Sequence, residues 1–228
     1  MASAANTRTD LGAPLRERLA ATRLYFVCDA QPGAWIVDAV LDQVLRAGVD
    51  ILQLRDKEAN DAALRAAAAT FRTVADRRGA PFLINDRPDL VDAAGADGVH
   101  LGQDDMPVSE AREIVGRERL IGLSTHSPEQ VDAAQSAGVD YISVGPVWET
   151  PTKEGRPAAG LELVEHAAAH SELPFFAIGG IDLENAPQVI AAGATRICVV
   201  RAIRDAGDPG VAAYRLRDVL PDDPPDTH

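Results

Sequence analysis

A chain of 228 residues, 46% of them hydrophobic, is long enough to bury a substantial core as one large α/β domain or two small ones. Its formal net charge of -13 excludes nonspecific adhesion to nucleic acid or to anionic lipid, because both need clustered cations. No run is apolar enough for a membrane span or a secretory signal, so we expect a cytoplasmic protein.

Continuously apolar runs alternate along the chain with amphipathic segments. The apolar runs predict strands at 24–28, 51–55, 82–85, 98–101, 120–124, 141–144, 175–178 and 196–200. The intervening segments predict helices at about 34–47, 61–78, 88–94, 109–115, 128–137, 162–169, 183–192 and 210–220. Because the strand runs are apolar throughout, they are typical of a parallel sheet covered by helices. Cys28 and Cys198 lie inside such runs and are expected to be reduced core residues.

A short motif, Ala-Gly-Val-Asp or a close variant, recurs at residues 47, 94, 137 and 192. Its glycine suits the left-handed residue that ends a helix, and a strand follows each copy. The successive starts are 47, 43 and 55 residues apart, which is about the length of two strand–helix units. The pattern therefore predicts a single (β/α)8 TIM barrel, with an open doubly wound sheet as the alternative.

The chain shows no internal linker between two cores, so we expect one barrel domain over residues 21–220. Residues 1–20 are polar and weakly patterned, and predict a flexible N-terminal extension. Residues 221–228 are rich in Pro and Asp and predict a disordered tail.

Cationic side chains gather where the second predicted strand ends. Gln53, Arg55 and Lys57 stand two residues apart, so on a strand they project from one face. Desolvating two neighbouring cations is costly unless an anion compensates them, which favours a phosphate or diphosphate ligand. The alternative is that both cations are solvated loop residues paired with Asp56 and Glu58.

Carboxylates follow the third and fourth predicted strands, at the rim where such barrels carry their chemistry. The third strand ends in Asn85-Asp86, and the fourth runs into a segment that ends at Asp105. Two carboxylates beside a pair of cations match a Mg²⁺ ion bridged to a diphosphate. Asp86 could instead cap the next helix.

The later strands carry a second set of candidate phosphate-binding groups. Thr150, Thr152 and Lys153 lie in a long loop that could close over a ligand, or could be a merely exposed connection. Gly180 and Arg201 follow the seventh and eighth strands, where this fold habitually grips phosphate.

Two anion sites on one rim imply a coupling reaction between two phosphorylated substrates. A metal-assisted diphosphate site would lie over strands two to four and a monophosphate site over strands seven and eight. No Ser-His-Asp arrangement, Cys nucleophile or imine-forming Lys within a strand is evident. His126 follows the fifth strand and is left outside the catalytic set.

Six motifs, taken in chain order, closely resemble those of the thiamine phosphate synthase family. They are Q-L-R-D-K (53–57), I-N-D-R (84–87), D-G-V-H-L-G-Q-D-D (97–105), G-L-S-T-H (122–126), G-P-V-W-E-T-P-T-K (145–153) and A-I-G-G-I (177–181). The match spans roughly residues 24–203. The resemblance implies a transferase that condenses 4-amino-2-methyl-5-(diphosphooxymethyl)pyrimidine with 4-methyl-5-(2-phosphooxyethyl)thiazole. The products would be thiamine phosphate and diphosphate, formed by a dissociative, Mg²⁺-assisted substitution.

The resemblance also implies roles for individual residues. Those implied to bind the pyrimidine diphosphate are Gln53, Leu54, Arg55, Asp56, Lys57, Asn85, Ser124 and Lys153. Within this set, Arg55, Lys57, Ser124 and Lys153 are implied to be catalytic. Asp86 and Asp105 would bind Mg²⁺. Those implied to surround the thiazole phosphate are Thr150, Pro151, Thr152, Gly180, Val200 and Arg201. Arg201 is a departure, because some family members carry a smaller hydroxyl residue there.

Other functions of the same fold need different residues. A thiazole tautomerase would not need the diphosphate and metal residues, and a noncatalytic regulator would bind the thiazole phosphate without releasing diphosphate. A sugar-phosphate epimerase or aldolase would need an acid–base pair or an imine-forming Lys inside the barrel. We expect two phosphorylated small molecules as partners and neither nucleic acid nor membrane, while a homo-oligomer stays open.

Overall fold

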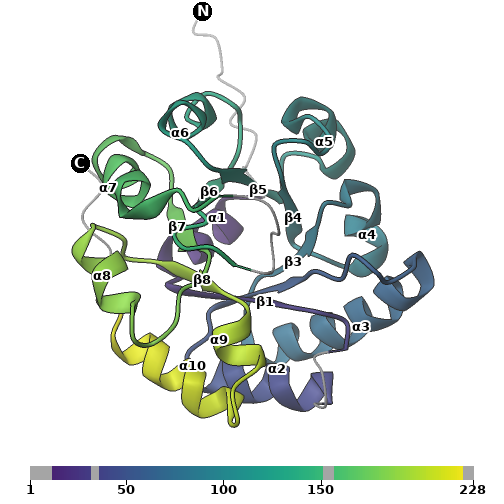
Figure 1. The fold of residues 1–228 in the computed structure, drawn as a ribbon. Coiled ribbons are helices and arrows are strands. Elements are labelled where there is room, and N and C mark those ends of the chain that lie inside the picture. Colours follow the sequence, from purple (N-terminus) through teal and green to yellow (C-terminus); the bar gives the residue numbers. More distant parts are fainter. Residues whose placement is uncertain (1–11, 32–35, 151–156, 223–228) are drawn as a thin grey trace, which may run out of the picture.

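Eight parallel strands close into a barrel in this computed structural model, which describes residues 12–31, 36–150 and 157–222 (Figure 1). The strands are β1 (Leu24–Cys28), β2 (Ile51–Leu54), β3 (Phe82–Asn85), β4 (Gly98–Leu101), β5 (Leu120–Thr125), β6 (Tyr141–Val144), β7 (Phe175–Ile178) and β8 (Ile197–Val199). Each strand pairs with its neighbour in sequence, and β1 also pairs with β8 through Leu24 and Ile197. The predicted TIM barrel is therefore confirmed, and the open sheet is wrong.

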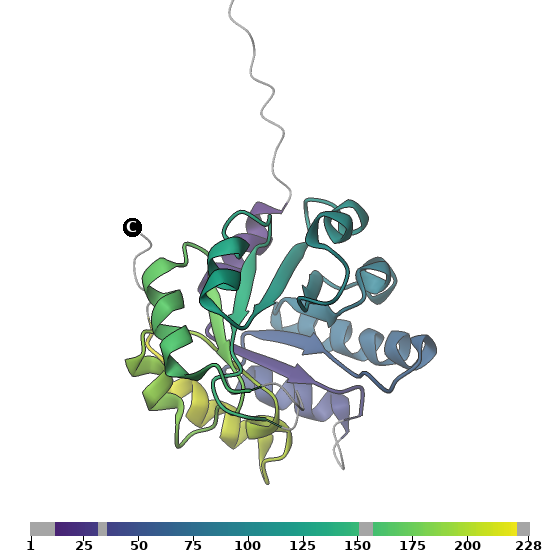
Figure 2. The same ribbon diagram turned by 45° about the horizontal axis from the view of Figure 1, so that its top comes forward.

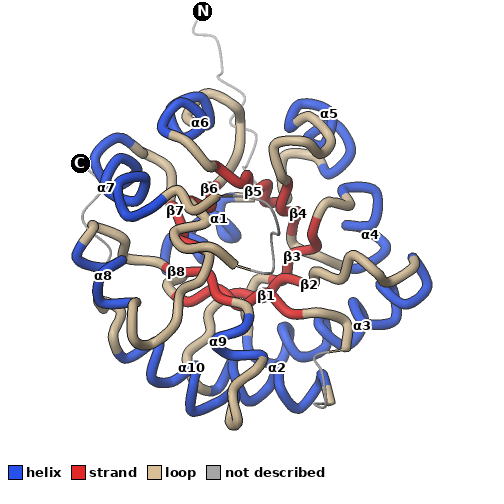
Figure 3. The backbone as a smooth tube through the Cα atoms, viewed as in Figure 1, coloured by secondary structure: helices blue, strands red, loops and turns tan. Residues whose placement is uncertain are grey.

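Helices surround the ring of strands, and α1 lies across one end of it (Figures 1, 2 and 3). They are α1 (Ala13–Ala21), α2 (Val37–Arg46), α3 (Asp61–Arg78), η1 (Pro88–Leu90), α4 (Val91–Ala94), α5 (Val108–Val115), α6 (Pro128–Ala134), α7 (Gly160–His170), α8 (Ala186–Ala191), α9 (Arg201–Arg204) and α10 (Pro209–Asp218). Two helices were not predicted: α9, which follows β8 directly, and α1. Within the described ranges, no helix is both long and apolar enough to cross a membrane.

The core has an outer and an inner part because side chains alternate along each strand. In β1, Leu24, Phe26 and Cys28 face the helices, whereas Tyr25 and Val27 face the barrel interior. Both cysteines are buried free thiols, as expected, and burial raises the pKa of Cys28 to about 12. The inner part is small and contains several polar groups, which matters for the site above it.

Helix α1 closes the amino-terminal end of the barrel. Its Leu19 is buried and packs in the inner cluster with Tyr25, Ile51 and Phe176. Residues 13–20 are therefore not part of a flexible extension, contrary to the expectation from sequence. Their polar surface misled the prediction, because only one face of this helix touches the barrel. Residues 1–11 and the expected tail beyond residue 222 lie outside the described residues.

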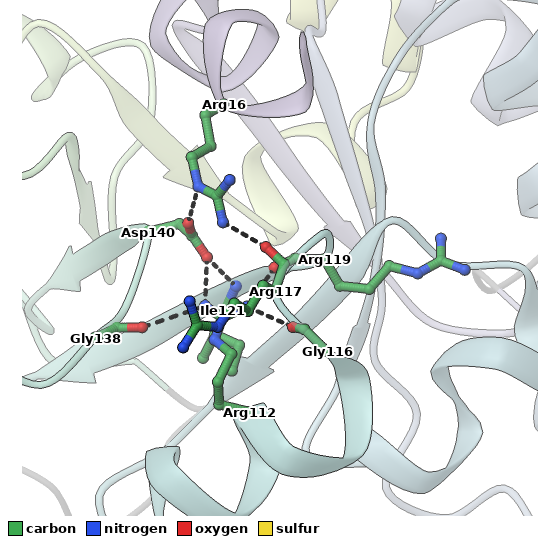
Figure 4. A network of polar contacts seen from close by, with 8 residues as sticks. All are labelled: Arg16, Arg112, Gly116, Arg117, Arg119, Ile121, Gly138 and Asp140. Carbon is green, nitrogen blue, oxygen red and sulfur yellow. Dashed lines mark hydrogen bonds and ion pairs between the residues drawn. The ribbon is translucent and has the colours of Figure 1, made fainter. Parts of the chain in front are cut away.

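A buried carboxylate, Asp140, attaches α1 to the barrel (Figure 4). It accepts hydrogen bonds from the backbone N–H of Ile121 (2.7 Å), from Arg112 Nη2 (2.8 Å) and from Arg16 Nε of α1 (2.7 Å). Arg112 also donates to the carbonyl oxygens of Gly116 (3.0 Å) and of Arg119 (2.6 Å). Asp140 thus joins α1, α5 and the starts of β5 and β6.

The recurrent Ala-Gly motif places an aspartate in the same position twice more. Asp50 accepts the backbone N–H of Leu24 (2.9 Å), and Asp97 accepts that of Phe82 (2.8 Å). In each case the aspartate's own N–H donates to the carbonyl of the same strand residue. These aspartate clamps, made by Asp50, Asp97 and Asp140, bind the starts of strands in pairs, which explains a motif that recurs every second unit. The fourth copy carries Thr195, whose hydroxyl accepts from Arg196 instead.

We predict that Asp140→Ala lowers the free energy of unfolding by about 3 kcal/mol, because it leaves Arg112 and the Ile121 amide without their carboxylate. Urea denaturation measures the change. Asp92→Ala is the control, since Asp92 is 84% exposed and makes only a surface ion pair with Arg119. Equal stabilities of the two variants would contradict the clamp.

Candidate active site

A cavity of about 650 Å³ opens at the carboxyl-terminal rim of the barrel. Most of the residues singled out from sequence line it: Gln53, Arg55, Lys57, Asn85, Asp86, Asp105, Ser124, Thr150, Gly180, Val200 and Arg201. They come from strands, from the loops that follow them or, for Arg201, from the start of α9, as the barrel requires. Pro151, Thr152 and Lys153 lie outside the described residues.

The side chains of Leu54 and Asp56 do not line this cavity. Leu54 is fully buried in the outer core, because alternation along β2 points it toward the helices. Asp56 accepts the backbone N–H groups of Glu58 and Ala59, both at 3.1 Å, and so shapes the loop after β2. The implied role of Leu54 and Asp56 in binding the pyrimidine diphosphate stays a prediction.

Lys57 pairs across the rim rather than with its neighbours in sequence. Its Nζ lies 3.5 Å from Asp86 Oδ2, whereas Asp56 is occupied by backbone amides. The alternative that Lys57 pairs with Asp56 is therefore wrong, although the Lys57 side chain is 60% exposed. The contact also places Lys57, a residue of the predicted diphosphate site, beside Asp86, a predicted metal ligand.

Asp86 and Asp105 lie in contact, and the pKa of Asp86 is raised. Burial is the main cause, followed by the hydrogen bond and the repulsion from Asp105, while Lys57 and Arg55 act in the opposite direction. Asp105 is held in turn by the Gly102 N–H, which donates to its Oδ2 at 2.6 Å. Two carboxylates forced together attract a cation, so the pair fits a divalent ion.

The backbone of Asp86 supports this arrangement. Its φ of 59° lies in the left-handed region, and among the described residues it is the only one other than glycine with a positive φ. The Asp86 N–H donates to the His100 carbonyl at 2.9 Å, so the residue continues the β3–β4 ladder. The next helix, η1, has Arg87 at its N-cap with no side-chain cap, so the capping role considered for Asp86 is wrong.

Within the described ranges, no group of three or more His, Cys, Asp or Glu side chains gathers as a metal site. A pair of carboxylates can hold Mg²⁺ when phosphate and water oxygens supply the other ligands. The chemistry of Asp86 and Asp105 therefore suits hard-cation binding that depends on an anionic ligand.

Two predicted residues, Gln53 and Ser124, are joined inside the barrel by three polar residues that sequence reasoning missed: Tyr25, His100 and Tyr141. Gln53 Nε2 donates to the Tyr25 hydroxyl, which lies 3.1 Å from the Tyr141 hydroxyl. His100 Nδ1 lies 2.9 Å from that hydroxyl, and His100 Nε2 lies 3.0 Å from Ser124 Oγ. We call these five residues the polar chain. Tyrosines and a histidine inside apolar strands read as core, and only their alternation with helix-facing residues could have revealed them.

Gly122 leaves the space that the Tyr141 ring of the polar chain occupies. A Cβ at Gly122 would lie 2.1 Å from Tyr141 Cζ, so only glycine admits the tyrosine ring beside β5. Burial raises the pKa of both Tyr25 and Tyr141 well above the usual value. Both hydroxyls therefore stay protonated and able to donate hydrogen bonds.

Gly179 and Gly180 have a packing role beside the predicted phosphate contact. A Cβ on Gly179 would lie 2.4 Å from Pro146 Cα, and one on Gly180 would lie 2.8 Å from Trp148 Cβ. The loops after β6 and β7 are joined by a hydrogen bond from Trp148 N–H to the Gly179 carbonyl, at 3.0 Å. The glycines thus permit the contact that positions the loop carrying Thr150.

Arg201 and His126 both line the cavity but differ in their surroundings. Arg201 is half exposed, and its Nε lies 3.8 Å from Asp205 Oδ2. His126 is held by its backbone N–H, which donates to Gln130 at 2.7 Å, and by its Nδ1, which donates to the Gly145 carbonyl. These contacts give His126 a structural role in joining the loops after β5 and β6.

Comparison with known proteins identifies the family. A family model described as thiamine monophosphate synthase matches residues 24–203. The chain is 53% identical over 202 residues to a thiamine-phosphate synthase of Thermus thermophilus, covering 87% of this chain and 97% of that protein. It is 51% identical over 201 residues to the Acidothermus cellulolyticus protein of the same name, covering 87% and 95%. The chain belongs to the thiamine-phosphate synthase family.

Solved structures agree with this assignment. Thiamine phosphate pyrophosphorylase from Pyrococcus furiosus is 32% identical with a TM-score of 0.79, and the match covers 90% of this chain and 96% of that one. A 3-hexulose-6-phosphate synthase, at 17% identity and a TM-score of 0.63, shares the fold alone. The resemblance of the six motifs to the thiamine-phosphate synthase family is therefore confirmed.

We predict that Gly179→Ala lowers the free energy of unfolding by about 2 kcal/mol, because its φ of 103° and the Pro146 backbone both oppose a Cβ. Gly207→Ala is the matched control, since a Cβ there would meet nothing within 4 Å. Urea denaturation of both variants provides the measurement. The packing role fails if Gly179→Ala is as stable as Gly207→Ala.

Proposed function

We propose that this protein joins the pyrimidine diphosphate to the thiazole phosphate and releases thiamine phosphate and diphosphate. The observation that carries the proposal is identity of 53% to a thiamine-phosphate synthase across 87% of the chain. The predicted enzyme class, a transferase of thiamine biosynthesis, follows from this relationship. The arrangement of cations and carboxylates on one rim supports the assignment of the two substrates to opposite sides of the cavity.

The diphosphate would lie over β2, β3 and β4. Arg55 and Lys57 would bind its oxygens, with Asn85 as a neutral donor beside them. Asp86 and Asp105 would hold Mg²⁺, which supplies Lewis-acid stabilisation of the leaving group when bound. Lys153 belongs to this group by resemblance and lies outside the described residues.

The two cations favour departure of diphosphate before attack by the thiazole nitrogen. Negative charge grows on the leaving oxygen as the carbon–oxygen bond breaks, and Arg55 and Lys57 would stabilise it. The electron-rich pyrimidine delocalises the positive carbon that remains. This route asks little of a general base, in keeping with the structural role of His126.

The thiazole phosphate would lie on the opposite side, over β7 and β8. Gly180, Val200 and Arg201 line the cavity there, together with Thr150 of the loop after β6. The Arg201 guanidinium would add a positive charge to a phosphate-binding site that otherwise consists of backbone and hydroxyl groups. Pro151 and Thr152 would complete it.

Residues of this site and its products distinguish the proposed function from the two rival functions. A thiazole tautomerase has no use for the Asp86–Asp105 pair or for Lys57 beside it. A noncatalytic regulator would bind the thiazole phosphate and release no diphosphate. Formation of thiamine phosphate from both substrates distinguishes the proposal from either.

We predict that wild-type protein forms thiamine phosphate only when both substrates and Mg²⁺ are present. Asp105→Ala should reduce turnover at least about 100-fold at limiting Mg²⁺, because one of the two carboxylates is lost. Chromatography of thiamine phosphate measures both results. Glu110→Ala, on the exposed face of α5 outside the cavity, is the control. Full activity of Asp105→Ala at limiting Mg²⁺ would contradict the metal assignment.

We predict that Arg201→Ala raises the KM for the thiazole phosphate about tenfold and leaves the KM for the pyrimidine diphosphate unchanged. The reason is that Arg201 lies on the β8 side of the cavity, away from Asp86 and Asp105. Steady-state kinetics with each substrate varied in turn provides the test. Arg215→Ala, on the exposed surface of α10, is the control. A change confined to the pyrimidine diphosphate would reverse the two-sided arrangement.

A further inference from the structure

Tyr141 stands apart from the rest of the polar chain. Gln53, Tyr25, His100 and Ser124 all line the cavity, whereas Tyr141 does not and is fully buried behind them. Its ring packs edge-on against Tyr25 and Phe176, and lies tilted against His100. Any influence of its hydroxyl on a ligand must therefore pass through a neighbour.

The contacts of the polar chain allow one consistent direction of donation. The Gln53 amide nitrogen is a donor, so the Tyr25 oxygen accepts from it. Either hydroxyl of the Tyr25–Tyr141 pair can donate to the other, and in this direction Tyr25 donates to Tyr141. Tyr141 then gives its own hydrogen to His100 Nδ1 at 2.9 Å. This places the imidazole proton on Nε2, which donates to Ser124 Oγ at 3.0 Å.

Ser124 accordingly acts as an acceptor on the side of the polar chain. Ser143 Oγ approaches the same oxygen at 3.4 Å and can also donate to it. With its oxygen so engaged, the Ser124 hydroxyl hydrogen is directed away from His100, on a residue that lines the cavity. A hydroxyl held this way selects a hydrogen-bond acceptor, such as a ring nitrogen of an aminopyrimidine.

We propose that Tyr141 is a positioning residue that fixes the imidazole tautomer of His100 and thereby turns Ser124 toward a ring nitrogen of the pyrimidine. The inference rests on the proposed function for the identity of the substrate, but not for the tautomer. The surroundings suit the role, because buried tyrosines cannot ionise easily and the ring is confined by Gly122. Since Tyr141 is in contact with neither the cavity nor the rim carboxylates, its effect is separable from metal and diphosphate binding.

The first test is independent of activity. Imidazole ¹⁵N spectra of histidine-labelled protein, with the His100 signals assigned by their loss in His100→Asn, report which nitrogen carries the proton. Wild-type protein should show the neutral form protonated at Nε2, and Tyr141→Phe should show a mixture of tautomers. Protonation of wild-type His100 at Nδ1, or an unchanged signal in Tyr141→Phe, would overturn the proposal.

The second test asks whether Tyr141 acts through Ser124. Tyr141→Phe should lower kcat/KM for the pyrimidine diphosphate about tenfold and leave the KM for the thiazole phosphate unchanged. The double variant with Ser124→Ala should be no worse than Ser124→Ala alone, within about twofold. Additive losses, or equal effects on both substrates, would mean that Tyr141 serves packing only.

Phe176→Leu is the matched control for packing, because Phe176 contacts both Tyr25 and Tyr141 but has no hydroxyl. It should lower thermal stability while the His100 tautomer stays the same; a tautomer mixture in this variant would overturn the proposal. If wild-type protein forms no thiamine phosphate, the proposed function fails, and the ¹⁵N spectra still decide the tautomer assignment.

Discussion

Closure of the parallel sheet is the constraint on which the site depends. Because every strand pairs in parallel with its neighbours and β1 also pairs with β8, all eight strands end at one rim. Residues as distant in sequence as Gln53, Asp105 and Arg201 therefore line one cavity without any local device to bring them together. At the opposite end, the aspartate clamps tie the strand starts in pairs, and Asp140 also holds α1. Stability and chemistry are thus assigned to opposite ends of the barrel.

The electrostatics of the rim follow from this arrangement. In a chain of net charge -13, Arg55 and Lys57 form a local cationic region that faces the Asp86–Asp105 pair. The raised pKa of Asp86 shows that burial and the neighbouring carboxylate outweigh the relief that the cations provide. The chemistry of such a site suits a divalent cation together with an anionic ligand, since each compensates the charge left by the other.

The sequence predicted those structural features that have a local cause. Apolar runs located β1, β3, β4, β6 and β7 to the residue, and polar residues at strand ends located both halves of the rim. It failed where the cause is a distant contact. Helix α1 was not predicted, because the residues that Arg16 and Leu19 contact, Asp140 and the inner cluster, are far along the chain. Tyr25 and Tyr141 are 116 residues apart, so nothing near either one signals their hydrogen bond. The packing role of Gly179 depends likewise on Pro146.

The inner cluster beneath α1 has a consequence for the route by which a ligand reaches the cavity. Leu19 packs among the inner side chains at the amino-terminal end, so in the described part of the chain the cavity opens at the carboxyl-terminal rim. Among the described residues, a ligand that contacts the polar chain therefore reaches it through the rim, past Arg55, Lys57 and the Asp86–Asp105 pair.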